Sequence, residues 1–223
     1  MTVIFGLTFI TGGLIGADTR RHNSLTRSAA GSGCKVRSFG NRAVVAKAGY
    51  GPSADHVWER IAEKVRGRDL DASEIADIVE EAGRAVLKEC RAKGLAEGTA
   101  PGDLQFLISG ISGDEPTIHG IQIGDMQRED AAGPGKVIAF GMRDETQARA
   151  VDLLECGLQK TSDGVLASVW NWTRDLVEEE RKGAPYAVDF PADVIFVRAG
   201  QTIEQFAVTS ETMSNPRGIV RVI

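Results

Sequence analysis

The sequence has few cysteines and no excess of basic residues, and each shortage excludes a class of protein. Its three cysteines, Cys34, Cys90 and Cys156, are neither even in number nor spaced as metal ligands, so neither a disulfide framework nor a metal site is expected. We expect buried free thiols in a reducing cytosol. The 26 basic against 31 acidic side chains give a net charge of −5, which argues against a general nucleic-acid binder.

Long apolar runs are also missing. No stretch approaches the roughly 20 apolar residues that a membrane-spanning helix needs. Residues 3–17 are fairly apolar, but no Lys or Arg precedes them and no small-residue cleavage site follows, so a signal peptide is not expected. The chain is therefore expected to be cytoplasmic, with neither a membrane nor a nucleic acid as partner.

What is present suits a globular protein. With 223 residues, 42% of them hydrophobic, residues 1–223 are expected to form a single domain with a sizeable core. Apolar periodicity predicts strands at 3–9, 14–17, 34–39, 42–48, 104–109, 117–123, 136–140, 193–197 and 202–208, and helices at about 57–65, 73–94, 145–158 and 164–182. Antiparallel strands alternating with helix pairs predict an α+β fold, a four-layer αββα sandwich of two antiparallel sheets flanked by helix pairs.

The opening stretch MTVIFGLTFITGGLIGADTRR allows two interpretations. TGGLIG after an apolar run is a possible glycine-rich phosphate loop, but such a loop needs a helix immediately after the glycines. The residues that follow are polar and have no helical apolar stripe. The glycines are therefore expected to belong to a hairpin of two strands.

The alternative places chemistry at Thr2, which becomes N-terminal once Met1 is removed. An N-terminal threonine carries a hydroxyl nucleophile and, in its α-amine with a reference pKa of about 7.7–8.0, a base. A nearby ammonium lowers the pKa of that amine, a carboxylate holds the ammonium, and a backbone N–H stabilises the oxyanion. Asp18, Lys35 and Gly49 supply these groups on neighbouring predicted strands.

These residues carry a family resemblance. The Thr-start strand, GGLIGADTR, KVRSFGNRAVVAKAGYGPSAD and the order of elements resemble a proteasome β-type subunit, including the HslV-type peptidases of the N-terminal-nucleophile hydrolases. The resemblance covers nearly the whole chain, though the second half matches by pattern more than by residues. It implies a threonine-type peptidase in which Thr2 is the nucleophile, Asp18 and Lys35 support it, and the Gly49 N–H serves the oxyanion.

The same resemblance implies partners. It predicts a homo-oligomer that cleaves peptides or unfolded proteins, with a possible ATP-dependent unfoldase and no cofactor or metal. Two departures stand out. Active members carry a serine where Met142 follows Ala139-Phe140-Gly141, and the loop 183–191 offers only Asp189 as a supporting polar residue. A catalytically inactive structural subunit and an N-terminal-nucleophile amidase acting on a small molecule therefore stay as alternatives.

Lys47 is a candidate for substrate binding. Strand alternation places Val45, Lys47 and Gly49 on one face, so Lys47 faces the substrate if Gly49 does. By resemblance this position is the floor of the first specificity pocket, where an ammonium favours an acidic side chain just before the cleaved bond. The alternative is a lysine on a solvent-facing strand.

Overall fold

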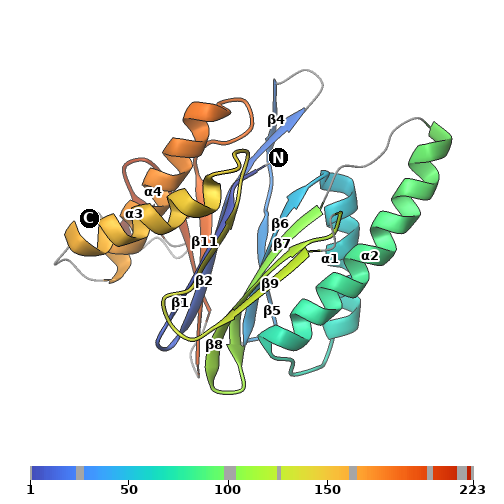
Figure 1. The fold of residues 1–223 in the computed structure, drawn as a ribbon, viewed down its shortest axis with the longest axis horizontal. Coiled ribbons are helices and arrows are strands. Elements are labelled where there is room, and N and C mark those ends of the chain that lie inside the picture. Colours follow the sequence, from blue (N-terminus) through green and yellow to red (C-terminus); the bar gives the residue numbers. More distant parts are fainter. Residues whose placement is uncertain are drawn as a thin grey trace.

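The computed structural model describes residues 2–23, 28–97, 104–124, 127–160, 165–199, 203–214 and 220–221. Two antiparallel sheets are stacked face to face, with one helix pair outside each sheet (Figure 1). The helices are α1 (Gly51–Val65), α2 (Ala72–Glu97), α3 (Thr146–Lys160) and α4 (Val165–Gly183). The predicted α+β sandwich of four layers is confirmed.

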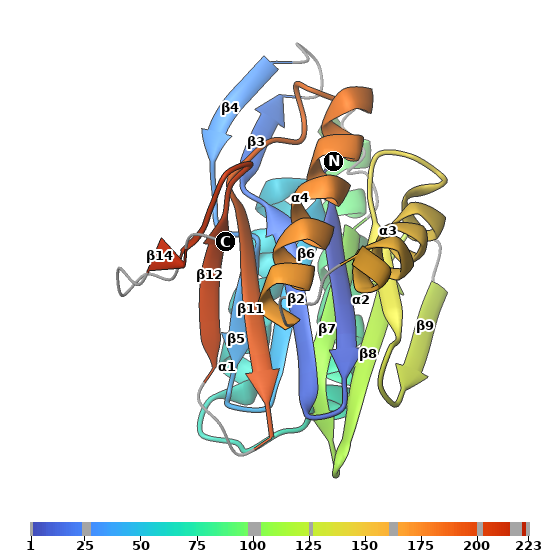
Figure 2. The same ribbon diagram turned by 90° about the vertical axis from the view of Figure 1, so that its left-hand side faces the viewer.

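Each sheet collects strands from distant parts of the chain. The seven-stranded sheet has the order β10 (Val137–Phe140), β1 (Ile4–Phe9), β2 (Gly12–Asp18), β11 (Ala192–Arg198), β12 (Glu204–Val208), β13 (Met213–Ser214) and β14 (Val220–Arg221). The five-stranded sheet has the order β5 (Val36–Phe39), β6 (Ala43–Gly49), β7 (Leu104–Ser112), β8 (Glu115–Gln122) and β9 (Gln127–Ala132). In Figure 2, α4 lies in front of the first of these sheets, on the face away from the second.

Alternation along the strands fills three apolar layers. On β1, Ile4 packs between the two sheets and Phe5 packs beneath α3 and α4. On β6, Val44 faces the seven-stranded sheet and Val45 faces α1 and α2. Both faces of these strands are covered. Their sequences are therefore nearly continuous apolar runs and do not alternate between apolar and polar residues.

The glycines of the opening stretch have a packing role. Gly16 lies opposite Phe5 in the β1–β2 pairing, and a Cβ on Gly16 would come within 2.2 Å of the Phe5 ring. A Cβ on Gly12 would meet the Val197 carbonyl oxygen at 2.0 Å. The structure therefore confirms a hairpin of β1 and β2 in place of a phosphate loop, and the close strand approach explains why glycine stands there.

Some elements differ from the sequence-based expectation. β3 (Arg20–Asn23) and β4 (Ser28–Ser32) pair with each other in a small separate sheet, where no strand was predicted. β9 was not predicted either, because it is a largely exposed edge strand with no apolar alternation. The cysteines are free, as expected, but Cys34 and Cys156 are exposed and Cys90 is half-buried. Among the described helices, none has the length and apolar character to cross a bilayer.

Candidate active site

The β1–β2 hairpin places Asp18 beside Thr2. Ile4 pairs with Ala17, and one step further the Asp18 N–H donates to the Val3 carbonyl at 3.3 Å. Asp18 has no exposed surface, and its Oδ1 accepts hydrogen bonds from the Val3 N–H at 3.0 Å and from the Thr2 hydroxyl. The nucleophile candidate and its carboxylate are thus brought together by local strand pairing.

Lys35 enters the same cluster from the other sheet. It immediately precedes β5, and its carbonyl accepts the Lys47 N–H at 2.9 Å. Its ammonium donates to Asp18 Oδ2 at 3.0 Å and also to Thr2 Oγ1. The Thr2 oxygen therefore lies between a carboxylate and an ammonium, an arrangement that polarises a hydroxyl.

Burial shapes the acid–base properties of this pair. It raises the pKa of Asp18 from 3.8 to about 6, against the opposing effects of the Lys35 ammonium and of the Val3 and Arg20 N–H groups. Burial also lowers the pKa of Lys35 from its usual 10.5, against the attraction of Asp18. Both side chains are thereby drawn toward the pH range in which enzymes transfer protons.

Gly49 ends β6 at the rim of a cavity. Its φ of +108° belongs to the region that favours glycine, and it turns the backbone toward α1. A cavity of about 1150 Å³ is lined by Thr2, Lys35, Lys47 and Gly49. Residues 141–144, directly after β10, line the same cavity. All four residues predicted from the Thr2 chemistry therefore lie close to this cavity, with Asp18 directly behind Thr2.

Lys47 is buried and not solvent-facing. Its ammonium lies 3.7 Å from the centroid of the Trp58 ring and forms an ion pair with Asp55 on α1. Burial lowers the pKa of Lys47 while the bond to Asp55 opposes that change. The Lys47 side chain is 6% exposed against 42% for Asp55, and Arg21 lies 3.7 Å from the same carboxylate. A carboxylate therefore covers the ammonium at the cavity floor.

Asp189 does not join the Thr2 cluster. Its carboxylate pairs with the Arg20 guanidinium and with Arg181 Nε at 3.2 Å. Arg20 connects it to the site: the Arg20 N–H donates to Asp18 Oδ2 at 3.0 Å, and its carbonyl accepts a hydrogen bond from Lys35. Asp189 thus contacts Arg20, and Arg20 in turn contacts Asp18 and Lys35.

Sequence reasoning missed Arg20 and Asp55. Arg20 acts through its main chain, which any residue supplies, so no side-chain pattern marks it. Asp55 lies on the first turns of α1, eight positions after Lys47, and faces it only because Gly49 turns the chain back over β6. An opposite charge shortly after a buried strand lysine is the one available signal.

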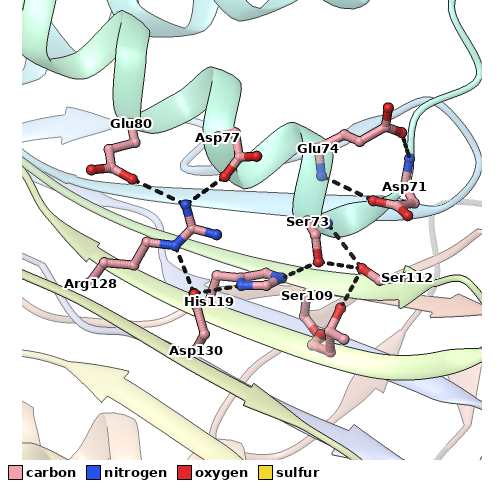
Figure 3. Close-up of polar contacts among 11 residues, drawn as sticks. Asp71, Ser73, Glu74, Asp77, Glu80, Ser109, Ser112, His119, Arg128 and Asp130 are labelled. Carbon is pink, nitrogen blue, oxygen red and sulfur yellow. Dashed lines mark hydrogen bonds and ion pairs between the residues drawn. The ribbon is translucent and has the colours of Figure 1, made fainter.

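A second polar cluster lies where α2 meets β8 and β9 (Figure 3). His119 Nδ1 lies 2.7 Å from Asp130 Oδ1, and His119 Nε2 lies 3.3 Å from Ser73 Oγ. This is the order of a serine–histidine–aspartate triad. However, the Ser73 N–H already donates to Ser112 Oγ, and the Glu74 N–H to the capping carboxylate of Asp71. Neither the Ser73 N–H nor the Glu74 N–H is therefore available to stabilise an oxyanion. We interpret the cluster as a structural one that joins α2 to the sheet.

The described residues have a proteasome-like fold, and solved structures of Anbu proteins resemble the chain. They include the "Helical Assembly of the Anbu Complex from Pseudomonas aeruginosa" (18% identity, TM-score 0.72, 94% of this chain and 87% of that one) and "Anbu (ancestral beta-subunit) from Yersinia bercovieri" (15%, 0.68, 94% and 88%). An Anbu (Gly-1) mutant from Hyphomicrobium sp. strain MC1 has 15% identity and a TM-score of 0.66, covering 95% and 88%. No protein-family model and no curated sequence matches the chain.

The expected family assignment is corrected by these matches. Proteasome β-type subunits of the HslV kind were expected, whereas the similar structures are Anbu proteins, a related but different group with a proteasome-like fold. Thr2, Asp18 and Lys35, the residues on which the expectation rested, did not separate the two groups. At 15–18% identity the likeness concerns the fold alone.

Proposed function

We propose that the chain is a threonine-type amide hydrolase that cleaves peptides, with Thr2 as its N-terminal nucleophile after removal of Met1. One observation carries the proposal: the Thr2 hydroxyl is bonded to both Lys35 and Asp18 at the wall of a large cavity. The intact mass of the purified protein tests the first requirement. Retention of Met1 favours the non-catalytic structural subunit, because an acylated amine is not a base.

The proposed reaction proceeds through an ester. Thr2 Oγ1 attacks the carbonyl carbon of the peptide bond while its proton passes to the α-amine, and the Gly49 N–H stabilises the oxyanion. When the C–N bond breaks, the ammonium returns the proton to the leaving amine. A water molecule, deprotonated by the same amine, then hydrolyses the ester. Lys35 lowers the pKa of the α-amine, and Asp18 keeps Lys35 in place.

Self-association is part of the proposal. The Anbu complex from Pseudomonas aeruginosa forms a helical assembly, and we infer that this chain also forms a homo-oligomer. Sedimentation velocity at micromolar concentration is expected to give species much larger than the 23.8 kDa chain. A single 23.8 kDa species over that concentration range would contradict this inference. Open and closed assemblies differ in whether their interfaces close, which electron microscopy shows directly.

The floor of the cavity is proposed to select the side chain that precedes the cleaved bond. Lys47 and Arg21 place two positive charges there, and Asp55 one negative charge. The net charge favours an acidic side chain, but Asp55 weakens the preference because its carboxylate occupies the Lys47 ammonium. Asp55→Asn is therefore expected to raise cleavage of peptides with Glu or Asp at that position about tenfold relative to apolar ones.

A peptide library at fixed ionic strength measures this preference, since salt screens such effects. Lys47→Ala should lose the preference for acidic residues while still cleaving apolar peptides. Asp144→Asn is the matched comparison: Asp144 lines the same cavity but Lys47 pairs with Asp55, so Asp144→Asn should change the profile much less than Asp55→Asn. If Asp55→Asn and the wild type have identical profiles, Lys47 does not face the substrate.

A further inference from the structure

Glu180 on α4 is a buried carboxylate that the proposed reaction does not use. Only 1% of its surface is exposed. Its Oε2 accepts the Met142 N–H at 3.0 Å, and its Oε1 accepts the Thr146 hydroxyl at 2.7 Å. A buried carboxylate is costly unless it is hydrogen-bonded. Thr146 is the first residue of α3, and the positive end of that helix further stabilises a negative charge.

These contacts fasten the segment between β10 and α3. Thr146 Oγ1 also lies 2.8 Å from the Arg143 carbonyl oxygen, which shares the single hydroxyl hydrogen with Glu180 Oε1, and the Thr146 N–H donates to the same carbonyl at 3.1 Å. A Cβ on Gly141 would lie 2.7 Å from Glu180 Oε2, so the chain passes directly over the carboxylate. On its other side, the Met142 side chain packs into the apolar layer beneath α3 and α4.

This segment faces the nucleophile. β10 pairs with β1 in the register that joins Ile4 to Phe140 and Phe5 to Ala139. Continued by two residues, the same register brings Met142 level with Thr2, and both residues line the same cavity. Glu180 therefore holds the backbone N–H of Met142, which the register places beside Thr2. Met142 stands at the position where the family resemblance implies a serine.

We propose that Glu180 is a positioning residue for the reaction at Thr2, an inference that rests on the proposed function. It acts by fixing the Met142 N–H, and with it the cavity wall beside Thr2. Small displacements of the groups around a reacting atom cost up to about a hundredfold in rate. Loss of the two hydrogen bonds frees this wall, so a bound substrate is held less accurately against the Thr2 hydroxyl.

The test uses Glu180→Ala, Glu180→Gln and Thr173→Val in the full-length oligomer. Glu180→Gln keeps an acceptor for the Met142 N–H, and its amide group can donate to the Thr146 hydroxyl. Thr173→Val is the matched control: Thr173 is a buried residue of the same helix whose hydroxyl has no partner among the described residues. Two readouts are taken: hydrogen exchange of the peptide spanning 141–147, and the rate of Thr2 acylation by a peptide β-lactone, whose ring opens as the Thr2 ester forms, at several probe concentrations.

In Glu180→Ala, the Met142 N–H is expected to exchange at least tenfold faster than in the wild type. Its maximal acylation rate should fall about tenfold to hundredfold, with probe affinity changed less than threefold. Glu180→Gln should recover most of the exchange protection and most of the acylation rate. Thr173→Val should match the wild type in both measurements. If Glu180→Ala does not fold, Thr146→Val removes one of the two partners and should slow acylation by a smaller factor.

Each failure has its own signature. A Glu180→Ala protein, or its Thr146→Val substitute, that is acylated as fast as the wild type overturns the positioning role alone. So does a Glu180→Gln protein that is as slow as Glu180→Ala, because the buried charge and not the hydrogen bonds would then matter. A wild type that has lost Met1 and is never acylated overturns the proposed function and this inference with it.

Discussion

Thr2→Ala is expected to abolish covalent labelling by a peptide epoxyketone, a loss of more than about a thousandfold in rate. An epoxyketone offers two electrophilic carbons, and the Thr2 hydroxyl and free α-amine are placed to react with one each. Alanine keeps the small second residue that allows Met1 removal but provides no hydroxyl. Intact mass spectrometry detects the result as a gain of the whole probe mass in the wild type and no gain in the variant.

Two further variants isolate the nucleophile from the fold. Thr2→Ser keeps a hydroxyl and should still be labelled. Thr8→Val is the matched control, because Thr8 is a buried threonine on the same strand whose hydroxyl bonds to the Gly133 carbonyl at 2.7 Å, away from the cavity. It should lower thermal stability through the lost hydrogen bonds and still be labelled. Equal labelling of Thr2→Ala and the wild type would place the reactive group elsewhere.

The part of the site that the sequence predicted depends on short-range strand pairing. Thr2 and Asp18 lie at the two open ends of one hairpin, so the predicted turn near Gly12 already brings them together. Lys35 and Gly49 likewise lie near the ends of a second predicted hairpin of β5 and β6. Local turn geometry and strand alternation determine these positions, and both can be read from consecutive residues.

The rest depends on contacts between distant elements. Glu180 meets Met142 across 38 residues, and nothing in the charged end of α4 distinguishes it from its solvated neighbours before α3 and α4 are packed. β9 pairs only with β8, so its polar side chains show no alternation. The role of Asp55 depends on the direction in which α1 leaves Gly49. Tertiary packing decides each of these, and one sequence alone does not specify it.

Asp18→Asn is expected to slow acylation of Thr2 by about a hundredfold to ten-thousandfold. The carboxylate accepts hydrogen bonds from Thr2, Val3, Arg20 and Lys35 at its two oxygens. Asparagine has only one side-chain oxygen that accepts hydrogen bonds. Its NH2 group replaces the other oxygen and would face groups that themselves donate. It also leaves the buried Lys35 ammonium without a counter-charge. Asp193→Asn is the control, since burial also raises the pKa of Asp193 on the adjacent strand β11, whereas no hydrogen bond among the described residues joins Asp193 to Thr2 or Lys35.

The pH dependence of acylation separates Asp18 from the α-amine. The amine must lose a proton below its reference pKa of about 7.7–8.0, because Lys35 lowers that pKa, and Asp18 must lose one near its pKa of about 6. The logarithm of the rate should therefore rise with a slope near one above pH 6 and near two below it. The pKa of Asp18 is about 6 in the folded protein, above the ordinary 3.8. Between these two pH values, protonation of Asp18 therefore stabilises the folded state as the pH falls. The steeper slope thus does not arise from unfolding caused by Asp18. In Asp18→Asn the slope should stay near one, and a wild-type slope of one down to pH 5 would show that Asp18 remains ionised there.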